Sequence, residues 1–190
     1  MDAVAPPSAW LARWAHLLPT GTQALDVACG SGRHMHWLHA CGLHPTGVDR
    51  DAQALAHAAR WGEVLCADIE GGPWPLAGRC FGAVVVTNYL WRPLLPAIAG
   101  AVAPGGVLLY ETFAQGNETV GRPARTDFLL RPGELLAACH ALRVIAYEDG
   151  FEDAHAGAPA RFVQRIAAVR TPEQTTGVIR LPLQPPGHGA

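Results

Sequence analysis

The chain has 190 residues, of which 49% are hydrophobic and 16% charged, and its formal net charge is −2. This length predicts a single domain, at about 100–200 residues per domain, and the composition excludes a disordered or collagen-like chain. All fourteen basic residues are arginines and no two are adjacent, so we expect no surface that follows the phosphates of a long nucleic acid.

Apolar runs separated by turn-forming residues predict a regular alternation of strands and helices. In chain order, the first half is expected to hold a helix over residues 9–18, a strand over 24–28, a helix over 33–41, a strand that ends at 49, a helix over 51–61 and strands over 63–68 and 81–87. The second half is expected to hold a helix over residues 94–102, a strand over 107–112, a helix over 134–140 and strands over 142–148 and 161–170.

Local residue chemistry supports several of these boundaries. Ser8 can cap the first helix, and Asp51 lies near the N-terminus of the third. The run Pro104-Gly105-Gly106 predicts a turn before the fifth strand. Beyond residue 170 the chain is rich in proline, so we expect one domain over residues 1–170 and a loose tail over residues 171–190.

The central strands are continuous apolar runs, which are typical of a parallel sheet covered by helices on both faces. The last two strands have no helical pattern between them and are expected to form an antiparallel hairpin at one edge. The sequence therefore predicts an α/β fold with a single Rossmann-like, doubly wound sheet of seven mostly parallel strands.

Targeting and metal-binding patterns are missing from the sequence. No apolar stretch approaches the length of a membrane span, and the first residues lack the regions of a secretory signal. Five cysteines without a C-x-x-C pair predict reduced thiols. His36 and His39 share a helix face, but no carboxylate joins them in a metal-binding pattern. We expect a cytoplasmic protein with no membrane partner and no metal.

A glycine-rich turn follows the first strand, at the sheet edge where ligands of such folds bind. Gly30 and Gly32 allow a close approach to a ligand, and the free N–H groups of the next helix suit an anion. A dinucleotide fingerprint requires a third glycine where Met35 stands, and a P-loop requires a lysine, which the chain lacks. These departures favour a carboxylate over a phosphate at the helix start.

Acidic residues end the second and third strands, and the first strand contains Asp26. Asp49, 19 residues after Gly30, can accept hydrogen bonds from both hydroxyls of a ribose, and Asp68 can accept one from an adenine amino group. Each acid alone also fits a structural role: Asp26 can satisfy loop amides, Asp49 can cap the next helix and Asp68 can hold a turn. Together they favour a nucleoside site without a strong phosphate cradle.

Five segments in order make the chain resemble the class I S-adenosylmethionine-dependent methyltransferases over roughly residues 20–170. They are residues 25–32 for the glycine-rich motif, 47–49 for the ribose acid, 66–69 for the adenine motif, 81–86 for the fourth strand and 103–109 for the turn before the fifth. Within this class, the chain looks most like the small tellurite-resistance-type methyltransferases, which are minimal domains.

The resemblance implies the strand order 3-2-1-4-5-7-6, with an antiparallel seventh strand, and S-adenosylmethionine as the cofactor. The glycine turn would hold the methionyl group, the second and third strands the nucleoside, and the end of the fourth strand would lie under the sulfonium. The implied cofactor-binding residues are Asp26, Ala28, Cys29, Gly30, Gly32, Asp49, Arg50, Asp68, Ile69, Thr87 and Asn88.

Methyl transfer depends mainly on alignment, and a base is needed only if the acceptor arrives protonated. Tyr89 and Glu111 are the candidate catalytic residues, and His34 is a weaker candidate base. Tyr89 and Trp91 can wall an acceptor pocket, or they can be core aromatics instead. Glu111 can equally be an anchor at the end of a strand.

Two features concern the acceptor. The run Thr87-Asn88-Tyr89-Leu90 lacks the proline pair of amino-group methylases and the cysteine of cytosine C5 methylases, which favours a small-molecule acceptor and no nucleic acid. The loop over residues 114–131 is a candidate lid. In this hypothesis residues 128–130 dock the loop and Arg122 or Arg125 faces an anionic acceptor; the alternative is a passive surface connection.

Two other functions fit the same residues. A non-catalytic module that binds S-adenosylmethionine or S-adenosylhomocysteine would keep all of the cofactor-binding acids and glycines. An NAD-dependent oxidoreductase fits less well, because Met35 stands at the position of the third glycine.

Overall fold

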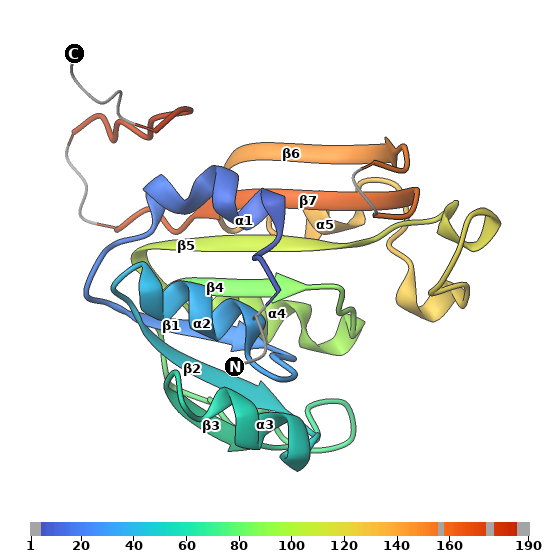
Figure 1. Ribbon diagram of the computed structural model, residues 1–190. Helices are drawn as coiled ribbons and strands as arrows, with labels where there is room; N and C mark the ends of the chain where they lie inside the picture. The colour runs from blue at the N-terminus through green and yellow to red at the C-terminus, as the bar shows by residue number, and fades with distance from the viewer. Residues whose placement is uncertain (1–4, 156–157, 174–176, 186–190) are drawn as a thin grey trace.

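The computed structural model describes residues 5–155, 158–173 and 177–185 and contains a seven-stranded sheet of order β3-β2-β1-β4-β5-β7-β6 (Figure 1). The strands are β1 (Gln23–Val27), β2 (His44–Asp49), β3 (Glu63–Cys66), β4 (Phe81–Thr87), β5 (Val102–Phe113), β6 (Arg143–Glu152) and β7 (Arg161–Val169). Strands β1 to β5 pair in parallel, whereas β7 runs antiparallel between β5 and β6. The predicted strand order and edge hairpin are confirmed.

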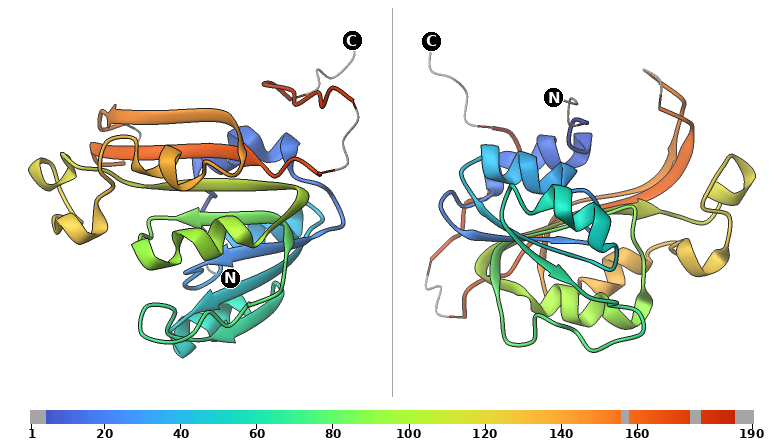
Figure 2. Two further views of the ribbon diagram at one scale, coloured as in Figure 1. Left: turned by 180° about the vertical axis from the view of Figure 1, so that it is seen from behind. Right: turned by 60° about the horizontal axis from the view of Figure 1, so that its bottom comes forward.

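Helices cover both faces of the sheet, as Figure 2 shows: α1, α2 and α3 lie on one face, and α4 and α5 on the other. The α-helices are α1 (Ala9–Trp14), α2 (Arg33–Ala40), α3 (Ala52–Ala58), α4 (Leu95–Gly100) and α5 (Glu134–Ala138). Four short 3-10 helices are η1 (Ala15–Leu17), η2 (Arg92–Leu94), η3 (Asn117–Thr119) and η4 (Thr126–Phe128). The predicted doubly wound fold is therefore confirmed.

Strand β4 shows why the central strands are continuous apolar runs. Val84 and Val86 pack in the cluster under α4 and α5, while Ala83 and Val85 pack in the cluster under α1 and α2. All four side chains are fully buried. Because successive residues of a strand point to opposite faces, a strand that is covered on both sides needs apolar residues at every position.

The fifth strand begins earlier than predicted. The helix expected over residues 94–102 ends at Gly100, because Val102 already pairs with Phe81 of β4. The expected turn at Pro104-Gly105-Gly106 is an irregular start of β5, where the register shifts and Gly105 has a φ of 78°. A side chain at position 106 would lie 2.8 Å from the Phe81 carbonyl oxygen, so glycine permits this close pairing.

Several other elements are shorter than predicted, for local reasons. Ser8 caps α1 by accepting a hydrogen bond from the Trp10 amide, and the α-helical turn ends at Trp14 before η1. Strand β3 ends at Cys66 because Asp68 forms a turn with the amides that follow it. The predicted helices over 33–41, 51–61 and 134–140 are also shorter, as α2, α3 and α5.

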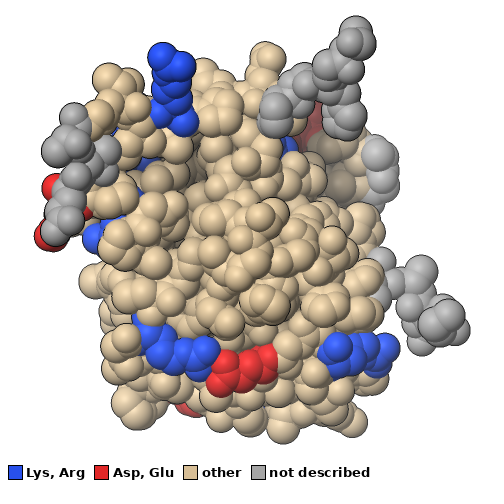
Figure 3. Space-filling view, turned by 90° about the vertical axis from the view of Figure 1, so that its left-hand side faces the viewer, with Lys and Arg blue, Asp and Glu red and all other residues tan. Residues whose placement is uncertain are grey.

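The described part of the C-terminal tail lies against the domain. Leu181 packs beside the cluster under α1, and the His16 Nε2 atom lies 2.9 Å from the Pro182 carbonyl oxygen. Among the described residues, no helix has the length and apolar character to cross a membrane. Figure 3 views the side at the amino ends of β1 to β4, where most of the surface is uncharged; the polar groups described next lie at the opposite end.

Candidate functional site

Two adjoining cavities lie beyond the carboxyl ends of β1, β2, β3 and β4. The turn cavity, of about 690 Å³, follows the loop between β1 and α2, and its lining includes Gly30 and Thr87. The acid cavity, of about 150 Å³, has Asp49 and Asp68 in its lining. Ala28 lines both cavities, so they adjoin at the end of β1. The turn cavity has a volume typical of small-molecule sites, and the smaller acid cavity extends it.

Two further cavities adjoin the first pair on the side of β5. The first of these, of about 270 Å³, is called the apolar cavity after its Leu90, Phe113 and Phe128 side chains, although Glu70 and Thr112 also line it. The arginine cavity, of about 360 Å³, has Arg33 and Arg122 in its lining. Asn88 lines the turn, apolar and arginine cavities, so the three meet where β4 ends.

The turn between β1 and α2 requires its glycines for different reasons. Gly30 has a φ of 52° and open space around it, whereas Gly32, with a φ of 84°, lies against α3. A side chain at Gly32 would stand 2.7 Å from the Ala58 Cβ atom. Ala28 also has a positive φ, of 55°, although it carries a side chain. Such strain occurs at functional sites, where the surrounding structure maintains it.

Asp49, at the end of β2, holds this turn. Its Oδ2 atom accepts a hydrogen bond of 2.8 Å from the Gly30 amide, and its Oδ1 atom accepts one of 3.0 Å from the Asp51 amide. The cap of α3 is Asp51, which accepts from the amides of Gln53 and Ala54. Each Asp49 oxygen keeps a second lone pair, so the carboxylate can still accept a hydroxyl group on each side.

Asp26 is the most unusual acid of the site. Its side chain is buried within β1, and Oδ2 has no hydrogen-bond partner among the described residues. Burial raises the pKa of this carboxyl to about 8, against the lowering effects of Arg33 and the Met35 amide. A buried acceptor without a partner costs free energy unless a donor satisfies it. A ligand ammonium group meets that need.

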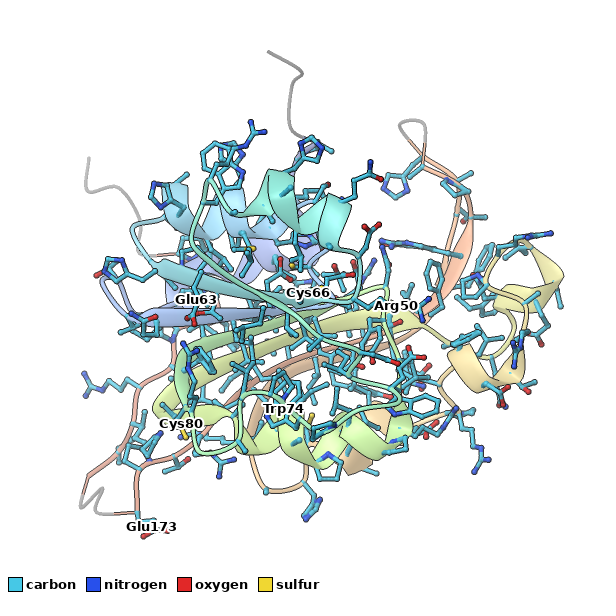
Figure 4. All side chains as sticks on the ribbon, turned by 90° about the horizontal axis from the view of Figure 1, so that it is seen from below. Arg50, Glu63, Cys66, Trp74, Cys80 and Glu173 are labelled. Atoms are coloured by element: carbon cyan, nitrogen blue, oxygen red, sulfur yellow. The ribbon has the colours of Figure 1, made fainter. Side chains whose placement is uncertain are left out.

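The acid cavity is bounded by the loop after β3. The Asp68 Oδ1 atom accepts hydrogen bonds from the amides of Glu70 and Gly71, and these bonds lower the pKa of Asp68. Ile69 lines the cavity beside it. Figure 4 shows Arg50 and Cys66 at the neighbouring ends of β2 and β3, where the Cys66 thiol contacts the Arg50 carbonyl.

Tyr89 forms the boundary between the acid and apolar cavities, because it lines both. Its hydroxyl group is buried and has no hydrogen-bond partner among the described residues. Burial raises the pKa of this phenol further above its ordinary value, so the neutral form persists. Together with Asp26, Tyr89 leaves a second polar group available for a ligand. Both Tyr89 and Trp91 pack against the large core cluster, but Trp91 is absent from the lining of the four cavities.

The end of β4 is tied to the start of α2 and to the N-terminal segment. His34 Nδ1 lies 3.2 Å from the Thr87 hydroxyl, and the Ser8 amide donates to His34 Nε2 over 3.3 Å. Burial lowers the pKa of His34 to about 4, so the ring is neutral near pH 7. Since Nε2 accepts, the ring proton resides on Nδ1 and faces Thr87. Asn88, the next residue, has a φ of 54°.

Glu111, at the buried end of β5, belongs to a network of ion pairs. Its Oε2 atom pairs closely with Arg165 and lies 3.5 Å from Arg161, while Oε1 accepts from the Ser8 hydroxyl. Arg165 also pairs with Glu148 and Glu152 at the edge hairpin. This arrangement matches an anchor at a strand end, and it also brings Glu111 into the lining of the arginine cavity.

The loop over residues 114–131 separates the two arginines that sequence reasoning placed at the acceptor. Arg122 lines the arginine cavity. Arg125 pairs with Asp127 over 2.9 Å and lies over the Phe128 ring, and it is absent from the lining of all four cavities. Residues 129–130 are fully buried, as expected for the docked end of this loop.

Sequence reasoning missed Ser8 and Arg33 as site residues. Ser8 was predicted only as a helix cap, although its amide and hydroxyl contact His34 and Glu111. Arg33 lines both the turn cavity and the arginine cavity. Its position directly after the glycine turn was a usable signal. Within the described residues, no group of three or more histidines, cysteines and acids is placed to hold a metal.

The residues present fit S-adenosylmethionine. The unpartnered Asp26 oxygen suits the methionyl ammonium group, and the N-terminus of α2 suits its carboxylate. The two oxygens of Asp49 suit the ribose hydroxyls. The acid cavity, with Ile69 and the free Tyr89 hydroxyl, suits a flat polar base.

Several solved structures share the fold. TehB from Haemophilus influenzae aligns with a TM-score of 0.71 and 17% identity, covering 90% of this chain and 64% of that one, so the chain spans less than two thirds of TehB. An S-adenosylmethionine-dependent methyltransferase from Mesorhizobium loti aligns with a TM-score of 0.63 and 18% identity, covering 83% of this chain and 95% of that one. Another from Methanosarcina mazei aligns with a TM-score of 0.66 and 15% identity, covering 89% of this chain and 100% of that one. Identities this low show the fold alone.

Comparison by sequence adds a partial match to one family. No curated protein matches the chain in sequence. Residues 24–106, which include the glycine turn, Asp49, Asp68 and Asn88, match the family model described as a methyltransferase domain. Residues 24–106, less than half of the chain, thus resemble a methyltransferase domain, and the sheet that contains them has the fold of solved S-adenosylmethionine-dependent methyltransferases.

Proposed function

We propose that the chain methylates a small-molecule acceptor by direct in-line displacement. The observation that carries this proposal is the meeting of three cavities at Asn88. The turn cavity lies on the cofactor side of Asn88, and the apolar and arginine cavities lie on the side of β5. A cofactor and an acceptor that occupy these adjoining spaces are brought together at the end of β4, as in-line transfer requires.

The chain's own residues bind and orient the cofactor in this proposal. Asp26 pairs with the methionyl ammonium group, Asp49 accepts the ribose hydroxyls, and Asp68 with Ile69 holds the adenine. When bound, the cofactor supplies a methyl group on a sulfonium: the acceptor atom gains the methyl carbon, the bond electrons go to sulfur, and a proton on the acceptor passes to water. Thr87 and Asn88 lie beside the point of transfer.

The residues around the acceptor align it with the methyl group and contribute little acid–base chemistry. Tyr89 presents a neutral hydroxyl that can hydrogen-bond an acceptor atom, since burial keeps its proton in place. Glu111 is held by Arg165 and Ser8, so its carboxylate positions the acceptor side of the site. The acceptor's volume is bounded by two cavities of about 270 and 360 Å³, which suits a small molecule.

Calorimetry with S-adenosylhomocysteine tests the cofactor part. Asp49→Ala is expected to weaken binding by about 1.5–3 kcal/mol, the usual value for a hydrogen bond to a charged group. Asp49→Asn recovers part of the loss, since one acceptor oxygen remains. Asp153→Ala, which removes an exposed acid on the distant hairpin, is the control and is expected to bind normally. Undiminished binding by Asp49→Ala would remove the ribose assignment.

Product formation tests the transfer itself. The protein with S-adenosylmethionine is incubated with a panel of small amines, phenols, thiols and carboxylic acids, and S-adenosylhomocysteine is quantified. Turnover with at least one member of the panel is expected. Turnover confined to nucleic acid or protein fractions would overturn the small-molecule acceptor, and cofactor binding without any turnover would favour a non-catalytic binding module.

A further inference from the structure

Four arginines lie near the acceptor side of the site, and two of them have acidic partners while two do not. Arg161 pairs with Glu152 and Glu111, and Arg165 pairs with three glutamates. Arg33 donates only to a backbone carbonyl, that of Pro6, over 3.3 Å. Neither Arg33 nor Arg122 forms an ion pair with any described residue. Both line the arginine cavity.

The charge of this cavity is therefore positive. Glu111 is the single acid in its lining, and Arg165 and Arg161 already neutralise it. The guanidinium groups of Arg33 and Arg122 form no ion pair with a described acid, although Arg33 acts on the buried Asp26 from a distance. A guanidinium presents two parallel donors that match the geometry of a carboxylate. An anionic group of a ligand would therefore complement this cavity.

The neighbouring apolar cavity defines the other part of the ligand. It shares Asn88 and Phe113 with the arginine cavity. The rest of its lining has an apolar side of Leu90, Pro123 and Phe128 and a polar side of Glu70, Tyr89 and Thr112. A molecule that fills both cavities has an apolar or aromatic body on one side of Phe113 and a charged group on the other. Both parts lie next to Asn88, where the turn cavity begins.

The shared wall is held in place by its own hydrogen bonds. The Asn117 side chain is buried, donates to the Pro123 carbonyl over 3.0 Å and accepts from the Phe162 amide over 3.2 Å. Arg92 donates to the carbonyls of Asp127 and Leu129. Arg122 and Pro123 lie between these two points of attachment, so one segment presents its charge to one cavity and its apolar surface to the next. Figure 1 shows this loop at the same end of the sheet as the turn between β6 and β7.

We infer that the methyl acceptor is a small organic acid with an apolar or aromatic body, whose carboxylate is bound by Arg33 and Arg122. The body occupies the apolar cavity, and the acceptor atom lies at Asn88. This inference rests on the proposed function and names the substrate class of the same site. Of the two arginines in the loop, it selects Arg122, because Arg125 is already paired with Asp127.

A matched pair of probes tests the inference. Protein saturated with S-adenosylhomocysteine is titrated by calorimetry with 3-phenylpropanoate and with 3-phenylpropanamide, which have the same body and differ in charge. The acid is expected to bind at least about ten-fold more tightly, the value of a charged hydrogen bond. Arg122→Ala is expected to remove this preference and to leave the amide and S-adenosylhomocysteine affinities unchanged.

Two more variants separate the two cavities. Phe128→Ala is expected to weaken both probes by a similar factor, because it removes part of the apolar wall that both share. Arg131→Ala removes an exposed arginine at the end of the same loop, outside the lining of the four cavities, and is expected to change neither probe.

The outcomes separate this inference from the proposed function. Equal affinities for acid and amide, no binding of either probe, or an unchanged preference in Arg122→Ala would each overturn the organic-acid acceptor while the cofactor site stands. A protein that does not bind S-adenosylhomocysteine would overturn the proposed function, and the inference with it.

Discussion

The half of the sheet formed by β1 to β4 and the half formed by β5 to β7 use opposite charges at the same edge. On the first side, Asp49 and Asp68 line the acid cavity, and the buried Asp26 has an oxygen without a partner among the described residues. On the second side, Arg122 of the loop after β5 lines a cavity whose acid is already neutralised, and Arg33 at the start of α2 reaches the same cavity from the first side. A cationic cofactor and an anionic acceptor would be sorted to opposite sides of Asn88 by these charges alone.

The two halves also achieve rigidity differently. The first half relies on backbone geometry, with positive φ values at Ala28 and Asn88 and a glycine in contact with α3. The second relies on side chains, because Glu111, Arg165 and the hairpin glutamates form one network. The family match covers residues 24–106, which include β1 from Ala24 on, β2 to β4 and the first residues of β5. We call the side of β1 to β4 the cofactor half and the side of β5 to β7 the acceptor half, after the roles proposed above.

Gly32→Ala is expected to give the largest loss of stability, in the cofactor half. A left-handed backbone with a side chain costs about 1–2 kcal/mol, and the contact with Ala58 adds about 1–3 kcal/mol, so the free energy of unfolding falls by about 2–5 kcal/mol. Gly30→Ala is the matched control, since the space around Gly30 is open, and only the backbone term applies. Chemical denaturation measures both variants; equal losses would contradict the role of α3 contact.

Glu111→Gln is the corresponding change in the acceptor half. It leaves the buried Arg165 with two of its three acids, so we expect the free energy of unfolding to fall by about 2–4 kcal/mol. Glu148→Gln removes a partly exposed partner of the same arginine and is expected to cost at most about 1 kcal/mol. If Glu111 acts as a base instead, turnover of the variant will fall far more than its stability.

The pH dependence of stability tests Asp26. Its pKa is raised to about 8 in the fold from an ordinary 3.8, so the folded state holds more protons than the unfolded chain between these values. The free energy of unfolding of the ligand-free protein therefore decreases with rising pH, by up to about 1.4 kcal/mol per unit. His34 acts in the opposite direction, but only below its ordinary pKa of 6.5, so the window is pH 6.5–8.

Denaturation across this window, with and without S-adenosylhomocysteine, provides the measurement. A bound ammonium group would stabilise the Asp26 carboxylate, so saturation with the ligand is expected to flatten the slope. Asp26→Asn is expected to flatten it in the ligand-free protein. A slope that persists in Asp26→Asn would assign it to another group.

Much of the cofactor half was predictable because its residues are set by local sequence. Asp49 and Asp68 follow strands directly, and in a parallel sheet the carboxyl ends of all strands meet at one edge. The spacing of acids and glycines therefore predicts that they gather. Local sequence did not predict that Asp49 holds the Gly30 amide or that β5 begins at Val102, since both depend on pairing between distant segments.

The acceptor half was less predictable for the same reason. Ser8 and Glu111 are 103 residues apart, yet they share a buried hydrogen bond. Arg122 and Arg125 have similar surroundings in sequence, and only the folded chain shows that one lines a cavity while the other pairs with Asp127. Because β4, β5, a loop and the edge hairpin together form this cavity, no local sequence pattern predicts it.

The smallest expected effect concerns the exchange of backbone amides with solvent in the loop over residues 114–131. The loop is attached at Asn117 and at residues 129–130, and the exposed segment around Arg122 lies between these two points.

S-adenosylhomocysteine would occupy the turn and acid cavities, so it is expected to slow exchange most at the turn around Gly30. In the loop, slowing by about two- to five-fold is expected near Arg122, because ligand near Asn88 restricts local opening there. Addition of 3-phenylpropanoate is expected to deepen protection in the loop and leave the glycine turn unchanged. Exchange in the loop that is the same in all three states would make it a passive connection and would confine ligand-linked ordering to the cofactor half.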